Sequence, residues 1–471
     1  MSNGKNVIWF LVDQMRADAM SCNGDPNINT PNLDLLSAQG INFERAVSGC
    51  PLCAPFRGSL LTGQYVHKST VPGHDYSLDP SMPTVATVFN QEGYDTIYFG
   101  KWHLDGDTPR KGTNTDPKKQ IVARDRRGDF GTWIGYENNN SQFECWVHGH
   151  DKDREIPLSR LMDFETNALS NMVIDKIRYY GEQKKNGQAK PFFLVLSVQP
   201  PHDPYTAPAA NMAHFNGQNL KLRPNVPPYE SVLMTARREL AGYYALIENI
   251  DENLGRIRQV LKEEELDLDT HIVFFSDHGD MHGSHGMFRK TNPYEESVRI
   301  PFIIGGEVPM GYYGRGCGRS KSLVNHVDIA PTTLGLCDIE KPDWMPGYDY
   351  SYERLPGLRK PSGPVPEEAY LQSVIPTRHD HSIDKPYRGI VTRDGYKYVC
   401  FEDHDWLMFD LNQDPYELVN LSNCPLSVKK RVELNEKLVR WVRETGDCFR
   451  VPVPEYVTFP TEYITYPEKR K

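Results

Sequence analysis

The sequence predicts an α/β fold in which helices sandwich a large, mostly parallel sheet, followed by a smaller C-terminal α+β subdomain with an antiparallel sheet. Two observations lead to this prediction. Up to about residue 340, short β-branched or aromatic runs alternate with longer helical patterns, as in a parallel sheet covered on both faces. After a linker rich in Pro, Gly and Tyr, short alternating runs separated by turn signals take over and indicate antiparallel strands.

Length and composition agree with this division. The 471 residues, of which 38% are hydrophobic, suffice for one large core and a satellite domain. We place the catalytic domain at residues 1–365 and the C-terminal subdomain, with its small sheet, helix and extended tail, at 366–471. The net charge of −10 argues against nucleic acid as a partner.

The N-terminus and the cysteines bear on the compartment. The start, MSNGKNVIWFLVDQ, has no basic n-region and no small-residue cleavage pattern, so we expect no signal peptide. No run approaches the roughly 18 apolar residues of a membrane span, so we expect no membrane association. The nine scattered cysteines indicate mostly reduced thiols. We expect a cytoplasmic protein as the sequence stands, or a periplasmic one if a leader was removed; a homo-oligomer stays open.

The elements follow from periodicity, taken in chain order. A further helix is expected to begin near Cys53, where small residues and leucines follow in CAPFRGSLLTG. The C-terminal antiparallel strands are expected in RGIVTRDGYKYVCF and WLMFDL, before a final helix at Ser427–Glu444. The strands expected in the large sheet are Asn6–Val12, Thr96–Gly100, Phe192–Val198, His271–Ser276 and Pro301–Gly305. The helices expected to cover it include Thr84–Glu92, Phe164–Tyr180 and Thr235–Glu263.

Polar residues follow the first four of these strands. They are Asp13-Gln14, Lys101-Trp102-His103, Gln199-Pro200-Pro201-His202 and Asp277-His278-Gly279. Because ligands of open α/β sheets bind outside the carboxyl ends of the strands, we expect these clusters to converge. Taken singly, an Asp-Gln pair is more often a turn, a histidine more often a packed residue and a lysine more often a surface residue. Together they predict a site, whose oxygens and one histidine nitrogen would suit Ca²⁺, Mg²⁺ or Mn²⁺.

Cys53 has a second interpretation. With Cys50 it forms a C-x-x-C motif, which can be a redox pair or half of a zinc site. No second C-x-x-C occurs, and the β-α context of a thioredoxin-like protein is missing before it. We therefore do not assign it a redox or zinc role.

The string CAPFRGSLLTG resembles the signature of the type I, formylglycine-dependent sulfatases, C-x-P-x-R followed by a small-residue helix ending in Thr-Gly. The resemblance covers nearly the whole chain and implies the alkaline-phosphatase-like fold of that superfamily. Further motifs occur in family order: VDQ, TPNLDLL, GYDTIYFGKWHL, PPHDPY, NIDENLGRI, FFSDHGD, KTNPYEESVRIP, VDIAPTTL, YKYV and LMFDLNQDPYELVNL.

The resemblance implies that Cys53 is converted after translation to Cα-formylglycine, whose hydrated aldehyde is the nucleophile. Pro55 and Arg57 then form part of what a maturation enzyme recognises. Arg57 lies four residues along the helix, where it can face the nucleophile, and the helix N-terminus adds partial positive charge beneath it.

The other roles carry over position by position. Lys101 and Lys290 resemble the pair that neutralises the sulfate oxygens. His103 resembles the base that takes a proton from the second hydroxyl of the nucleophile, and His202 resembles the general acid near the leaving oxygen, where it also binds substrate. The implied metal, Ca²⁺ in the first place with Mg²⁺ or Mn²⁺ as alternatives, is bound by the following residues: Asp13, Gln14, Asp277, His278 and the converted Cys53.

The chain departs from the family pattern at three places. Many members carry Asp and Asn at the positions of Gln14 and His278, which leaves the identity of the metal open. Phe56 replaces a small residue between Pro and Arg, which bears on maturation. The segment from Asp105 to Arg160 has no match.

We therefore expect a sulfuric ester hydrolase that acts on a carbohydrate sulfate, with aryl and alkyl sulfates left open. The first alternative is a phosphonate or phosphate monoester hydrolase of the same superfamily, against which the GKWH stretch argues. The second is a non-catalytic protein that binds sulfated glycans, which would have lost Cys53, Lys101 or His103. The carbohydrate preference rests on residues of the 105–160 segment that can bind sugars: Trp133, Tyr136, Asn138, Asn139, Asn140, Trp146 and His148.

Overall fold

The computed structural model describes residues 5–106, 116–307, 314–357, 360–361, 363–378 and 381–452. A ten-stranded sheet forms its centre, in the order β10-β2-β9-β8-β1-β7-β3-β4-β5-β6. The strands are β1 (Asn6–Asp13), β2 (Ile41–Val47), β3 (Asp95–Lys101), β4 (Thr132–Tyr136), β5 (Trp146–Asp151), β6 (Arg154–Arg160), β7 (Phe192–Pro201), β8 (Thr270–Ser276), β9 (Phe302–Gly305) and β10 (Gly318–Asn325).

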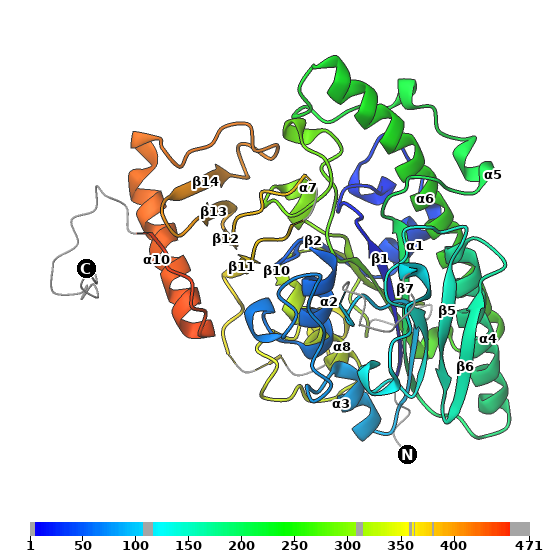
Figure 1. Cartoon of the computed structure of the whole chain (residues 1–471). Coiled ribbons are helices and arrows are strands. Elements are labelled where there is room, and N and C mark those ends of the chain that lie inside the picture. Colours follow the sequence, from blue (N-terminus) through cyan, green and yellow to red (C-terminus); the bar gives the residue numbers. More distant parts are fainter. Residues whose placement is uncertain are drawn as a thin grey trace.

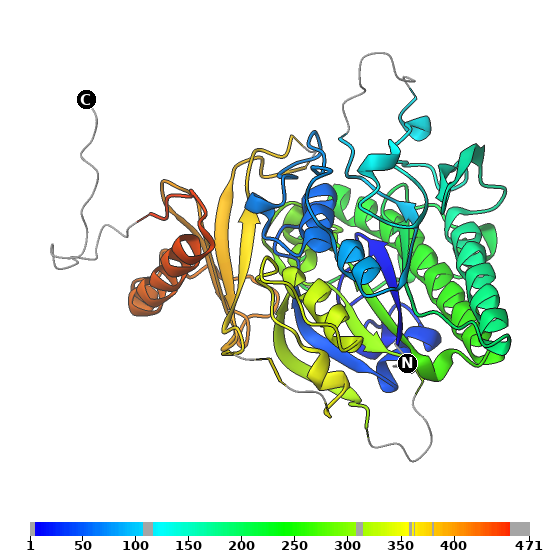
Figure 2. The same ribbon diagram turned by 90° about the horizontal axis from the view of Figure 1, so that it is seen from below.

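Helices cover both faces of this sheet (Figure 1, Figure 2). Successive residues of β1 point to opposite faces, so Ile8 and Phe10 join one apolar core while Val7 and Trp9 join the other. Helices α1, α4 and α6 close the first core, and α2, α3 and α8 close the second. The helices of this part are α1 (Pro31–Ala38), α2 (Cys53–Thr62), α3 (Val85–Gln91), α4 (Glu165–Lys185), α5 (Ala209–Met212), α6 (Glu230–Glu263), α7 (Glu295–Val298), α8 (Ile329–Leu336) and α9 (Ser351–Arg354).

The predicted fold class is confirmed, with one difference inside the sheet. Strands β8, β1, β7, β3 and β4 run parallel to their neighbours in this group. The expected strand Pro301–Gly305 forms β9, but it runs antiparallel to both β8 and β2. The chain between β8 and β9 makes no crossover helix of the length that a parallel return requires, so β9 comes back in the opposite direction.

The segment from Asp105 to Arg160, of which residues 107–115 lie outside the described ranges, extends the sheet through its described part. It supplies β4, β5 and β6, and three of its aromatic or histidine side chains are buried there. Trp133 is 0% exposed, Tyr136 1% and His148 3%; Trp133 packs against Trp102 with ring centroids 5.9 Å apart. The interpretation of these three as sugar-binding groups is therefore wrong, because they fill the core under the sheet edge.

A four-stranded antiparallel sheet follows in the C-terminal part, as predicted. Lys397 of this sheet is 0% exposed, and its Nζ donates to Glu417 Oε1 at 2.7 Å and to the carbonyl of Pro293 at 2.8 Å, next to α7. Lys397 Nζ also lies 2.7 Å from Glu295 Oε1 of α7. Its contacts with Pro293 and Glu295 tie the small sheet to the loops around the large one. Its elements are β11 (Glu368–Ser373), β12 (Tyr387–Thr392), β13 (Tyr396–Cys400), β14 (Asp405–Asp410) and α10 (Val428–Thr445).

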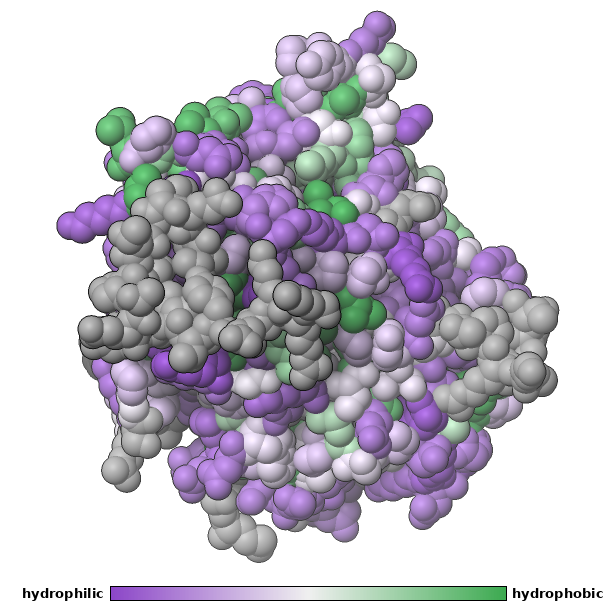
Figure 3. All heavy atoms as spheres, turned by 60° about the vertical axis from the view of Figure 1, so that its left-hand side comes forward, coloured by the Kyte–Doolittle hydropathy of each residue, from purple (hydrophilic) through white to green (hydrophobic). Residues whose placement is uncertain are grey.

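On the face shown in Figure 3, hydrophilic residues predominate and apolar ones are scattered among them, as is usual for a protein surface. None of the helices in the described ranges combines the length and the apolar character needed to cross a membrane.

Candidate active site at the carboxyl ends of the strands

The four predicted polar clusters converge at one edge of the large sheet. Strands β8, β1, β7 and β3 are consecutive neighbours in the sheet and run parallel, so their carboxyl ends meet. Helix α2 begins at Cys53 at the same edge. The residues brought together, none more than 7% exposed, are Asp13, Gln14, Cys53, Arg57, Lys101, His103, His202, Asp277, His278 and Lys290.

Cys53 lies at the centre of this cluster. Lys290 Nζ donates to its Sγ at 3.1 Å, and His278 Nε2 lies 3.1 Å from the same atom. Burial by itself would raise the pKa of the thiol, but Lys290 and Lys101 outweigh it and hold the pKa well below its usual value. The position therefore favours an anion, as expected where a nucleophile or a sulfate oxygen is to carry negative charge.

Arg57 organises the carboxylates next to Cys53. Its guanidinium donates to Asp13 Oδ2 at 3.1 Å, and its Nε lies 3.7 Å from Asp277 Oδ2. It also donates to Ser197 Oγ at 2.7 Å and to the carbonyl of Lys101 at 2.9 Å. Arg57 thus joins the ends of β1, β3 and β8 to the middle of β7, and its charge is shared with the carboxylates rather than directed at Cys53 alone.

The donor atoms at the ends of β1 and β8 fit a divalent cation. Asp13, Cys53, Asp277 and His278 offer ligand atoms within 4.8 Å of one another. Nδ1 of His278 lies 3.0 Å from the carbonyl oxygen of Gly279; because a carbonyl can only accept, Nδ1 carries the proton and the Nε2 lone pair faces the carboxylates. Asp277 Oδ2 is buried and accepts no hydrogen bond within the described ranges.

Two further features support the same fit. Burial and the neighbouring Asp13 raise the pKa of Asp277 to about 6, the behaviour of a carboxylate that is buried beside a second one. Gln14 Nε2 donates to Asp280 Oδ2 at 2.5 Å and to the Tyr205 hydroxyl at 3.2 Å. The amide is thereby oriented with Oε1 toward the site. Oxygen donors with a single imidazole suit Ca²⁺, Mg²⁺ or Mn²⁺.

Two lysines and a histidine lie around Asp13, Gln14 and Cys53. Lys290 Nζ donates to Gln14 Oε1 at 2.9 Å and lies 2.8 Å from His202 Nε2. Lys101 Nζ donates to Asp13 Oδ2 at 2.8 Å. His202 Nδ1 lies 2.8 Å from the carbonyl oxygen of Asp203 and 3.3 Å from its carboxylate, so Nε2 is the ring nitrogen that faces Lys290.

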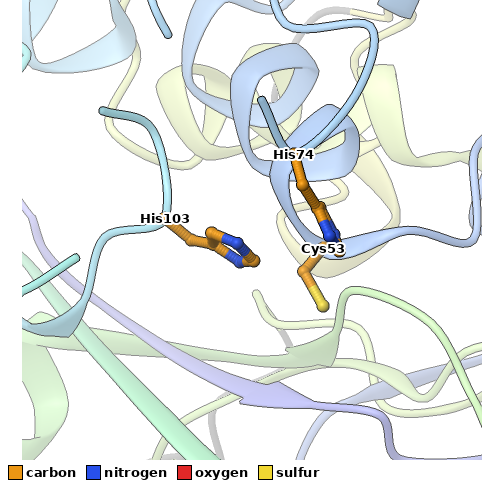
Figure 4. Close-up of side chains that lie close together, drawn as sticks. All are labelled: Cys53, His74 and His103. Carbon is orange, nitrogen blue, oxygen red and sulfur yellow. The ribbon is translucent and has the colours of Figure 1, made fainter. Parts of the chain in front are cut away.

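His103 hydrogen-bonds the Cys53 sulfur, and a residue that the sequence analysis missed lies beside it. The His74 and His103 ring centroids are 4.6 Å apart, and both histidines place a ring nitrogen within 4.8 Å of Cys53 Sγ (Figure 4). His74 follows no strand. Its only sequence signal is the turn VPGHD, which by itself indicates a loop.

Other supporting residues were also missed. Ser197 lies inside β7 and holds Arg57, and Asp280 orients Gln14. Asp280 follows FFSDHG directly, so its position near the ligands could have been suspected. Ser197 carries no such signal, because a serine within an apolar strand is indistinguishable from a packed residue.

The chain resembles known sulfatases over most of its length. A family model described as Sulfatase matches residues 5–339, and one described as N-sulphoglucosamine sulphohydrolase, C-terminal, matches 283–444. An ulvan-active sulfatase of Formosa agariphila is 33% identical over 454 residues, covering 94% of this chain and 82% of the relative.

Solved structures agree. A putative sulfatase of Bacteroides fragilis has a TM-score of 0.82 at 28% identity, covering 96% of this chain and 99% of that one. A phosphonate monoester hydrolase of Agrobacterium radiobacter has a TM-score of 0.71 at 22% identity, covering 94% and 96%; at that identity the likeness concerns the fold.

Proposed function

This chain belongs to the sulfatase family, and from that premise we propose that it hydrolyses sulfate monoesters of a carbohydrate through a nucleophile made from Cys53. The observation that carries the proposal is the convergence on one buried thiol of two lysines, of His74, His103 and His278, and of carboxylate oxygens, with His202 next to Lys290. The lysines match the negative charge of a sulfate group, and His103 and His202 match its proton transfers.

The thiol itself is a poor match for hydrolysis of a sulfate ester, and conversion of Cys53 to formylglycine by a maturation enzyme would supply the missing chemistry. The hydrated aldehyde offers two hydroxyl groups on one carbon: one attacks sulfur, and loss of the proton from the other lets sulfate leave. His202 gives a proton from Nε2 to the leaving alcohol oxygen, because Nδ1 is engaged with the carbonyl of Asp203 and Nε2 is the ring nitrogen that faces Lys290. His103, hydrogen-bonded to the side chain of residue 53, takes the proton of the second hydroxyl.

Asp13, Gln14, Asp277 and His278 would hold the divalent cation, Ca²⁺ in the first place and Mg²⁺ or Mn²⁺ otherwise. Such an ion lowers the pKa of a hydroxyl bound to it. Lys101 and Lys290 neutralise the sulfate oxygens as charge redistributes in the transition state.

A saccharide is the leaving group that the neighbourhood supports best. Asn140, at the surface, accepts a hydrogen bond from Gln199 at 2.7 Å, and Gln199 lies 3.4 Å from His202. A polar amide beside the general acid can bind sugar hydroxyls. The relative from Formosa agariphila acts on ulvan by its name, which favours the same substrate class.

A phosphonate or phosphate monoester hydrolase is the second candidate, because the fold is shared with such an enzyme. Two contacts favour sulfate: Lys101 pairs with Asp13, and His103 contacts residue 53. Lys101 and His103 both belong to the GKWH stretch, which the sequence analysis took as an argument for a sulfate substrate and against a phosphonate.

Activity against a substrate panel tests this proposal. Protein produced together with a maturation enzyme is expected to release sulfate from sulfated mono- or disaccharides. It should turn over phosphonate and phosphate monoesters at least about 10²-fold more slowly, because these groups differ from sulfate in charge and geometry and therefore meet a higher activation barrier at this site. Aryl sulfate serves as an activated reference. Faster turnover of a phosphonate ester than of every sulfate ester would overturn the assignment.

Removal of the metal is expected to abolish turnover. Exhaustive chelation should remove the ion that lowers the pKa of the attacking hydroxyl, and added Ca²⁺ or Mg²⁺ should restore the rate. Asp277→Asn should lose both bound metal, measured by elemental analysis, and activity. Asp267→Asn, a change in the 3₁₀ turn before β8 at the opposite end of that strand, is the control and should keep both. Full turnover by metal-free protein would contradict the ligand assignment.

A further inference from the structure

His74 is presented to the nucleophile by a loop that leads from α2 to α3. A ring nitrogen of His74, a ring nitrogen of His103 and the Cys53 sulfur all lie within 4.8 Å of one another. Figure 4 shows the two imidazoles reaching the sulfur from separate segments of chain. His74 is half-buried, whereas the assigned site residues are buried, so it lies between the nucleophile and solvent.

Contacts on both sides of His74 fix this loop. Val71 is 0% exposed and packs so closely over α2 that a Cβ at Gly58 would come within 2.8 Å of it. Beyond His74, the amide of Leu78 donates to the carbonyl of Leu104 at 2.9 Å. The loop is therefore anchored to the helix that begins at Cys53 and to the segment that carries His103.

A second backbone contact reinforces the link to that segment. Ser77 pairs with Asp105 in an isolated antiparallel bridge, two residues beyond His103. Because both histidines belong to segments joined by backbone hydrogen bonds, their relative position is preorganised and does not depend on an isolated flexible side chain.

In a sulfate group attached to the side chain of residue 53, the free oxygens lie one bond beyond the sulfur atom of the sulfate, and so farther out than the side-chain atom itself. A donor within 4.8 Å of the Cys53 side-chain atom is then within hydrogen-bonding reach of such an oxygen. Imidazole nitrogens donate to anions, and a bond to a charged acceptor is stronger than one between neutral groups. His74 therefore has the geometry of a sulfate ligand.

We propose that His74 is a substrate-binding residue that donates a hydrogen bond to the sulfate group of the substrate, alongside Lys101 and Lys290. This inference rests on the proposed sulfatase function of the site. It assigns to His74 a contact with the sulfate itself, which every substrate shares, and no part in proton transfer.

Binding of inorganic sulfate tests the assignment without turnover. In calorimetric titrations of the matured, metal-loaded protein, His74→Ala is expected to weaken sulfate binding about tenfold or more, the loss expected for one hydrogen bond to a charged group. Substitution by Asn or Gln, which keep a side-chain N–H, should recover part of that affinity in at least one of the two variants. His214→Ala, which removes an exposed histidine paired with Glu248, is the matched control and should bind as the unaltered protein does.

Kinetics separate this role from a positioning role. A contact made in the ground state and the transition state alike raises KM with little change in kcat, so His74→Ala should raise KM about tenfold for saccharide and aryl sulfates alike. A fall in kcat without a change in the dissociation constant of sulfate would overturn the proposal, because His74 would then act through His103. An unchanged dissociation constant in a variant that melts within a few degrees of the unaltered protein would also overturn it.

Failure of the proposed function would look different. If the matured protein hydrolysed no sulfate ester but bound sulfate with a dependence on His74, the binding assignment would stand and the catalytic one would fall. If His74→Ala proves too unstable for titration, His74→Leu provides the same measurement, because leucine fills part of the space of the imidazole and has no side-chain N–H.

Discussion

Cys53→Ala is expected to abolish sulfate ester hydrolysis while leaving the fold intact. The proposed nucleophile forms only by oxidation of this thiol, so the variant has no group that can attack sulfur. Loss of a nucleophile costs about 10⁶-fold in kcat in well-studied hydrolases. Alanine is the best helix former and fits at the first residue of α2, so circular dichroism and thermal melting should be close to those of the unaltered protein.

The control lies three residues away. Cys50 is also buried, at 4% exposure, but burial raises the pKa of its thiol to about 12, so it has none of the anionic character of Cys53. Cys50→Ala should therefore retain turnover. Mass analysis of the peptide that contains residue 53 should show loss of sulfur in active protein, and Cys53→Ser should be inactive without a serine-oxidising maturation enzyme. Full turnover by Cys53→Ala would disprove the mechanism.

The predictability of the site follows from where its residues lie in the fold. Asp13, Lys101, His202 and Asp277 each come at or directly after the end of a buried strand. Parallel strands are recognisable because both of their faces are apolar, and their carboxyl ends meet by topology. Convergence of these residues could therefore be predicted before any contact was known.

His74 and Ser197 could not be found in this way. His74 reaches Cys53 only because Val71 and Leu78 anchor its loop, and tertiary contacts of that kind leave no local pattern. Trp133 is the opposite case, a residue that was assigned a binding role and does not have one. A tryptophan can stack on a sugar ring, but the residue type does not reveal which face of a strand at the sheet edge points inward, and Trp133 lies in the core.

Loss of His202 and loss of His103, the two histidines proposed to transfer protons, is expected to affect turnover in different ways. A general acid matters in proportion to the basicity of the leaving group: a sugar alkoxide needs a proton, whereas a nitrophenolate hardly does. His202→Ala should therefore reduce kcat/KM for a sugar sulfate far more than for an activated aryl sulfate, with a gap of about 10²-fold or more, the lower end of general acid catalysis. Parallel assays on the two substrates measure that gap.

His103→Ala should leave release of the alcohol running and stall release of sulfate, since removal of the proton from the second hydroxyl is the step that depends on His103. Rapid mixing should then show a burst of about one alcohol per active site, followed by a slow steady state, with saccharide and aryl substrates alike. Equal losses on both substrates for His202→Ala, or absence of a burst for His103→Ala, would show that the two roles are misassigned. The sulfatase assignment would survive that result, because it depends on residue 53 and the anion-binding lysines rather than on which histidine moves which proton.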